Sequence, residues 1–93
     1  MPLIIRDPRL EGGKKTERLI ELIDLYPTLC ELTGIPIPQH CQGRSFKNLI
    51  KDPEANQRLD AYSSYPALKN MGHSIHFKNY RYTEWRDPKG KTI

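Results

Sequence analysis

The chain of 93 residues allows one small domain with a thin core, and its 37% hydrophobic content is below that of a typical globular domain. Fifteen Lys and Arg against eleven Asp and Glu give a formal net charge of +4, a mild bias toward anionic partners. The composition excludes a membrane span, because no apolar run is long enough, and two cysteines exclude a disulfide framework.

The first predicted element is a short buried strand in "PLIIRDP", residues 2–8, an apolar run closed by Asp-Pro. Such a strand needs neighbours on both edges, and the chain offers few. The stretch is too short, and too soon followed by charges, to be a signal peptide. The cellular location is therefore unknown.

A helix is predicted from Leu22 to a C-terminal cap at Gly34. The start is placed near Leu22 because Pro27 is tolerated near the beginning of a helix but not in its interior, and residues 17–21 are expected to be extended. Leucines at three- and four-residue spacing form an apolar stripe on one side of the helix, which needs a packing partner that this sequence does not contain. This stripe consists of Leu22, Leu25, Leu29 and Leu32.

A second, short helix is predicted in "FKNLIKD", residues 46–52, after a proline-containing connection. Ser45 is its expected N-cap, and Pro53 ends it. Its inward-facing side chains are predicted to be Phe46, Leu49 and Ile50.

Strands are predicted in the last third of the chain. "AYSSYP" is one, with Tyr62 and Ser64 on one face, and "MGHSIHFKNYRYTEW", residues 71–85, is a hairpin. Its two-residue turn is Lys78–Asn79, where Asn tolerates a positive φ. The expected pairs are Phe77–Tyr80, Ile75–Tyr82 and His73–Glu84 on a buried, mainly aromatic face, and Ser74–Thr83 and His76–Arg81 on a polar face.

The histidines and cysteines do not predict a metal site. His73 and His76 are three residues apart on a strand and so point to opposite faces. His40 and Cys41, even with Cys30, lack a fourth ligand, and "HCQGRS" has the residue types of a nucleophilic site without the geometry. A disulfide between the cysteines stays open.

Nucleic-acid binding is an alternative interpretation of the hairpin, because its rings alternate with basic side chains. We expect cross-strand pairing to bury Tyr80 and Tyr82 instead, and predict no nucleic-acid partner. The residues weighed for this surface are Tyr80, Tyr82, Trp85, Lys78, Arg81 and Arg86.

The segments that carry a family resemblance occur in this order: "PLIIRDP", "ELIDLYPTLCELTGIPIP", "CQGRSFKNLIKDP", "AYSSYP" and "MGHSIHFKNYRYTEW". Together, these segments resemble the C-terminal part of type I sulfatases. They are most similar to the iduronate-2-sulfatase-like branch of the alkaline-phosphatase-like superfamily. The resemblance implies an α/β fold, with one buried strand and helices followed by a small antiparallel sheet. Residues 1–53 would end the catalytic α/β domain, and residues 54–93 would begin a C-terminal subdomain with a β-hairpin.

Such enzymes hydrolyse sulfate esters with a formylglycine, made from a Cys or Ser in a C/S-x-P/A-x-R motif, beside a calcium ion. Neither Cys30 nor Cys41 is followed by that motif, so the resemblance transfers no catalytic or metal residue to this chain. The family's order places those groups upstream of Met1, and a further segment after Ile93. Whether the chain is itself an enzyme is uncertain, and we expect it to be inactive alone.

The resemblance implies one candidate substrate-binding residue, Lys69, in the loop between two strands near the substrate pocket. Ala67 stands where a basic residue is usual. The implied partner of the parent enzyme is a sulfated carbohydrate, with no membrane partner, and exposed core surfaces would allow self-association. The alternative is a stand-alone small basic module that binds a polyanion.

Overall fold

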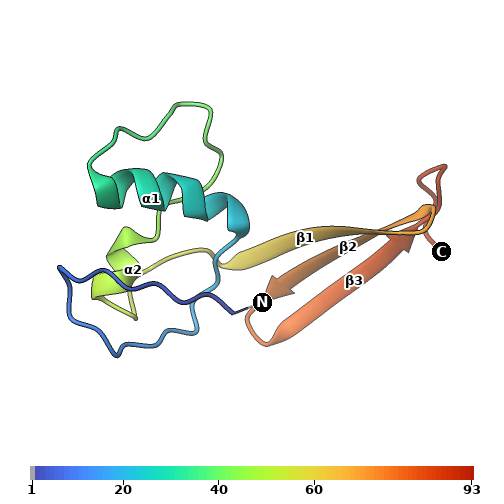
Figure 1. Cartoon of the computed structure of the whole chain (residues 1–93). Helices are drawn as coiled ribbons and strands as arrows, with labels where there is room; N and C mark the ends of the chain where they lie inside the picture. The colour runs from blue at the N-terminus through green and yellow to red at the C-terminus, as the bar shows by residue number, and fades with distance from the viewer. Residues whose placement is uncertain (1) are drawn as a thin grey trace. The chain divides into compact units, whose positions relative to one another are not determined.

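The computed structural model describes residues 2–93 and divides into two compact units. The helical unit contains the residues up to Arg18 together with Leu22–Gln57, and the sheet unit contains Leu19–Glu21 and Arg58–Ile93 (Figure 1). The fold class is confirmed: short helices precede a three-stranded antiparallel sheet. Across the described residues, no helix is both long and apolar enough to cross a membrane.

The helical unit is built on a 3-10 turn η1, Leu22–Asp24, that leads into helix α1, Leu25–Thr33. Helical structure begins at Leu22 as predicted, but the α-helix itself begins at Leu25, so Pro27 lies in its first turn, where its missing N–H has no helical acceptor. The predicted C-cap is also confirmed: Gly34 has a φ of 78°, a left-handed conformation that glycine adopts without a Cβ clash.

The predicted leucine stripe of α1 is buried only in part: Leu32 lies in the core and Leu25 is half-buried, but the most buried side of the helix is a more polar one. Leu22 and Leu29 are 67% and 49% exposed, whereas Asp24 and Thr28 are fully buried. This side faces the backbone of residues 44–46, whose N–H groups need hydrogen-bond acceptors when they are taken out of water. Periodicity of apolar residues does not reveal a face that is selected to satisfy a neighbouring backbone.

Two side chains supply those acceptors. Asp24 Oδ1 accepts a hydrogen bond of 2.8 Å from the Arg44 N–H. Thr28 Oγ1 accepts one of 2.9 Å from the Phe46 N–H and donates one of 2.6 Å to the Asp24 carbonyl. Gly43 completes the contact, because a Cβ there would lie 1.9 Å from the Ile23 carbonyl oxygen.

Helix α2, Lys47–Lys51, follows directly. Phe46, rather than Ser45, is its N-cap residue, but Ser45 Oγ still accepts a hydrogen bond of 3.3 Å from the Lys47 N–H. The inward side chains are as predicted: Phe46 and Leu49 are buried and Ile50 is half-buried. The small apolar core of the chain consists of Cys30, Leu32, Phe46 and Leu49.

The buried strand predicted at the start of the chain is not formed. The described residues 2–7 have no strand structure, and Leu3 and Ile4 are 43% and 91% exposed. A strand requires ladder partners, and every strand of the described chain belongs to the single sheet β1-β2-β3. The apolar run therefore has no partner in this structure.

The sheet unit consists of β1, Asp60–Ala67, β2, Asn70–Phe77, and β3, Tyr80–Arg86, in the order β1-β2-β3. Every predicted cross-strand pair of the hairpin is confirmed. The positive φ of the turn falls on Lys78, at 52°, and not on Asn79 as predicted. The turn between β1 and β2 repeats this feature, with a φ of 56° at Leu68.

A third turn follows β3 and was not predicted. The Asp87 carboxylate accepts hydrogen bonds from the N–H groups of Lys89 and Lys91, and Gly90 has a φ of 83°. Thr92 then pairs with Arg86, so the chain returns along the outer edge of β3. The Asp-Pro-Lys-Gly sequence is typical of such a turn, with proline at its second position and glycine at its fourth.

The aromatic face of the sheet is exposed, which contradicts the prediction that pairing would bury it. Tyr80 and Tyr82 are 76% and 63% exposed. Pairing places rings side by side on one face, but burial requires a second layer, and the sheet unit contains no helix or second sheet. On the opposite face, the Trp85 ring lies directly over Gly72, where a Cβ would be 2.9 Å from it.

Candidate functional site

Lys69, the candidate substrate-binding residue, lies at the tip of the β1–β2 turn. Ala67 pairs with Asn70, so Leu68 and Lys69 form a two-residue turn in which both side chains are exposed. The sequence thus placed Lys69 correctly between two strands. Its contact with a substrate stays a prediction.

A polar cluster lies on the aromatic face of the sheet. The Tyr62 hydroxyl is hydrogen-bonded to His73 Nδ1, and Ser64 Oγ lies 3.3 Å from both polar atoms. The rings of Tyr62 and His73 stack with centroids 6.0 Å apart. The register places Glu84 opposite His73 on the neighbouring strand, where its carboxylate forms an ion pair with Arg86. This arrangement can bind polar ligands but lacks a buried, activated nucleophile.

His73 and His76 are on opposite faces of β2, as predicted, because they lie an odd number of positions apart on one strand. His73 pairs with Ser64 and Glu84 on one face, and His76 pairs with Ala61 and Arg81 on the other. Throughout residues 2–93, no three His, Cys, Asp or Glu side chains gather where they could hold a metal ion.

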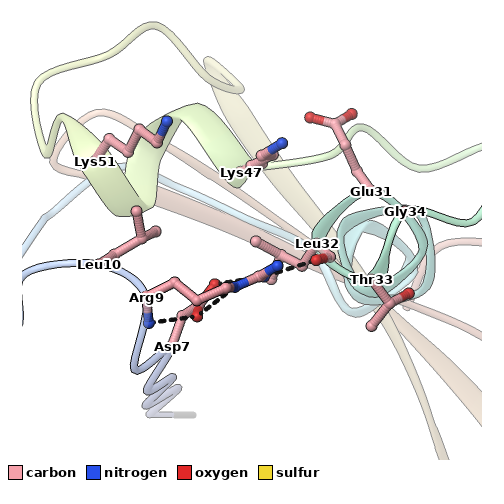
Figure 2. Close-up of a pocket in the computed structure, with 9 residues that line it drawn as sticks. All are labelled: Asp7, Arg9, Leu10, Glu31, Leu32, Thr33, Gly34, Lys47 and Lys51. Carbon is pink, nitrogen blue, oxygen red and sulfur yellow. Dashed lines mark hydrogen bonds and ion pairs between the residues drawn. The ribbon is translucent and has the colours of Figure 1, made fainter.

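The helical unit has an open pocket of about 440 Å³ (Figure 2). Arg9 crosses it, binding Asp7 at 2.8 Å and donating a hydrogen bond of 2.7 Å to the Leu32 carbonyl at the end of α1. Hydrogen bonds from the Arg9 side chain and backbone lower the pKa of Asp7 to about 2, and the pair raises the pKa of Arg9. The lining residues are Asp7, Arg9, Leu10, Glu31, Leu32, Thr33, Gly34, Lys47 and Lys51.

This pocket is a structural contact rather than a reactive site. Its best-placed charged groups, Asp7 and Arg9, already satisfy each other and the α1 carboxyl end. It attaches the otherwise irregular N-terminal segment to the helix, and no sequence pattern singled out Arg9 for that role.

The two cysteines are free thiols, Cys30 buried in α1 and Cys41 half-buried in the following loop. Cys30 cannot present a reactive group to a substrate from inside the core, and neither cysteine has the expected modification motif.

Comparison with known proteins identifies the family of this chain. The family model described as N-sulphoglucosamine sulphohydrolase, C-terminal, matches residues 1–87. The chain is 35% identical to iduronate 2-sulfatase of Mus musculus, over 82% of the chain and 20% of the relative. It is 40% identical to arylsulfatase K of Xenopus laevis, over 71% of the chain and 12% of the relative. A sulfatase of Formosa agariphila is 33% identical, over 92% of the chain and 16% of the relative.

The chain therefore spans a fifth or less of the length of these curated relatives. The match covers both the helical unit and most of the sheet unit, and it includes every helix and strand described above.

Proposed function

Since the chain belongs to the N-sulphoglucosamine sulphohydrolase C-terminal family, we propose that it serves as the C-terminal part of a sulfatase that hydrolyses sulfate esters of a sugar. In this role the chain supplies packing surfaces and a substrate-facing turn, and the reacting groups come from the rest of the enzyme.

One observation carries this proposal: apolar side chains that a self-sufficient domain would bury are exposed within the segment that the family model matches. Contiguous exposed apolar surface on a soluble protein marks an interface. The exposed side chains on the aromatic face of the sheet are Tyr62, Met71, Ile75, Phe77, Tyr80 and Tyr82. We propose that the remainder of the sulfatase covers them.

The helical unit supports the same role. Leu22, Ile23, Tyr26 and Leu29 are each about half exposed or more on η1 and α1. In the proposed enzyme these side chains face the rest of the catalytic domain. This explains why this side of the helix is apolar although the chain alone leaves it exposed. Separated from that partner, the same surfaces would favour self-association.

In the proposed enzyme, formylglycine and calcium are supplied from outside these 93 residues, since neither Cys30 nor Cys41 begins the C/S-x-P/A-x-R motif. We therefore expect the chain alone to be inactive. Lys69 is our candidate for contact with an anionic group of the sugar, since its ammonium group is exposed at a turn tip and no carboxylate of the described chain pairs with it.

A chimera tests this proposal. The chain would replace the matching segment of mouse iduronate 2-sulfatase, with deletion of that segment as the control. We expect the chimera to be soluble and to hydrolyse an iduronate 2-sulfate substrate, whereas the deletion variant does neither.

Two further measurements use the isolated chain. We expect it to bind the dye ANS through its exposed apolar faces and to show no aryl-sulfate hydrolysis with or without calcium. Calcium-dependent turnover by the isolated chain, or a soluble but inactive chimera, would contradict the proposal.

A further inference from the structure

We propose that one end of the sheet binds a sulfated polysaccharide through Lys69, Lys89 and Lys91, and we call these three residues the basic end. The choice of a sulfated ligand rests on the function proposed above. The gathering of the three lysines rests on the sheet topology alone.

The topology places two turns at the same end of the sheet. β1 and β3 run in the same direction, so the turn after β1, which carries Lys69, and the turn after β3, which carries Lys89, lie at one end (Figure 1). Pairing of Met71 with Arg86 fixes this alignment. Adjacent strands are about 4.8 Å apart, so the two turns, two strand spacings apart, lie within roughly 10 Å of each other.

The acidic groups at this end are already engaged. Glu84 forms an ion pair of 2.8 Å with Arg86, and the Asp87 carboxylate accepts the backbone N–H groups of Lys89 and Lys91 at 3.0 and 2.8 Å. Within the described part of the chain, none of the three lysines of the basic end forms an ion pair. The Asp87 carboxylate keeps its negative charge, but the three lysines and Arg86 outnumber Glu84 and Asp87, so this end of the sheet carries a net positive charge, which favours an external anion.

Backbone hydrogen bonds hold the turn that carries Lys89 and Lys91. In the second turn, Gly90 N–H donates to the Asp87 carbonyl at 2.9 Å, and Asp87 N–H donates to the Lys91 carbonyl at 2.9 Å. The chain beyond it is held by the Ile93 N–H, which donates to the Trp85 carbonyl at 2.9 Å. Binding would then order lysine side chains but no backbone, which lowers its entropic cost.

The chemistry of this end favours a sulfated polymer over other anions. A single small anion would contact one turn, whereas an extended polyanion reaches both. Nucleic acids gain affinity from bases that stack on aromatic rings, but the turn residues beside these lysines are Leu68 and Pro88. Lysine ammonium groups act as point charges, which suit the charge of a sulfate ester without requiring bidentate geometry.

The test measures binding of the 93-residue chain to heparin across a range of salt concentrations, with a single-stranded oligonucleotide for comparison. The test variant is K69Q/K89Q/K91Q. The matched control is K15Q/K47Q/K51Q, which removes the same formal charge from exposed or half-buried side chains of the helical unit. A third variant, K69R/K89R/K91R, keeps the charge.

We expect the test variant to lose roughly tenfold or more in heparin affinity and to have a shallower dependence of log affinity on log salt, because fewer counterions are released. The control and the arginine variant should stay within about twofold of the unaltered chain. Equal losses in the test and control variants would overturn the proposal, as would absence of heparin binding or tighter binding of the oligonucleotide. The chimera's hydrolysis tests the proposed function separately, so the two failures can be told apart.

Discussion

Replacement of Thr28 by valine tests whether the hydroxyl bridge between α1 and the chain before α2 stabilises the helical unit. Thr28→Val keeps the shape and the β-branch but removes an oxygen that accepts the Phe46 N–H and donates to the Asp24 carbonyl. Thr28 is fully buried, with 0% of its surface accessible to water. The Phe46 N–H would therefore stay buried without a partner.

An unsatisfied buried donor costs about 1–3 kcal/mol of unfolding free energy. Thr28→Ser is the control, because it keeps the hydroxyl and loses one methyl group, at about 0.8 kcal/mol. The two variants thus differ most at the Phe46 amide. We expect its hydrogen exchange to quicken in Thr28→Val, about tenfold for each 1.4 kcal/mol lost, and to stay slower in Thr28→Ser.

Amide exchange by NMR and urea unfolding measure these two quantities. The reasoning would be refuted if Thr28→Val left the Phe46 exchange rate within about twofold of the original and changed the unfolding free energy by less than about 0.5 kcal/mol.

Four further predictions follow from other contacts. Gly43→Ala should lower the unfolding free energy measured by urea denaturation by about 1–3 kcal/mol, because the added Cβ meets the Ile23 carbonyl. In Gly12→Ala the added Cβ meets only the flexible Arg6 side chain, so this control should cost little. Gly72→Ala should displace the Trp85 ring, seen as a red-shifted fluorescence maximum; an unchanged spectrum would contradict the contact. Leu68→Gly should stabilise the sheet by up to about 1 kcal/mol in thermal unfolding, because Leu68 has a positive φ and a fully exposed side chain, and a lower melting temperature would speak against this. The Asp7 carboxyl should titrate by NMR with a pKa of about 2. The stability that its pair with Arg9 contributes is therefore fully present above the unfolded-state pKa near 3.8 and is lost as the pH falls through about 2. In Arg9→Gln the pKa of Asp7 should rise, and an unchanged titration midpoint would refute the pairing.

The strand pairing of the hairpin could be predicted from the sequence because its information is local. Alternation of polar and apolar residues sets which face each side chain takes, and a two-residue turn at Lys78–Asn79 then fixes every pair. The same is true of α1, whose limits depend on Pro27 and Gly34 within the helix itself. The sequence did not reveal that the positive φ falls on Lys78, since asparagine is the residue that usually tolerates it.

Burial could not be predicted in the same way, because it depends on what lies opposite. Thr28 and Asp24 are buried against backbone N–H groups from residues 44 and 46, which have no sequence signature. Tyr80 and Tyr82 were placed on the correct face but not covered, since pairing within a sheet supplies no second layer. For the candidate site, the sequence predicted that Lys69 lies in a turn but not that it lies near Lys89. That proximity depends on the strand order, in which β1 and β3 run in the same direction and therefore end at the same end of the sheet.

The path of the chain between the two units has a consequence for dissecting this protein. Leu19–Glu21 belongs to the sheet unit although the chain on both sides belongs to the helical unit, and it is joined to Arg58 by the Leu19 bridge and by an ion pair of 3.1 Å from Glu21. A protease that cuts once, between Gln57 and Arg58, would therefore leave two pieces that stay associated through these contacts. A gene truncated to start at residue 58 would produce a sheet without its Glu21 partner, so neither unit can be expressed intact as one continuous segment.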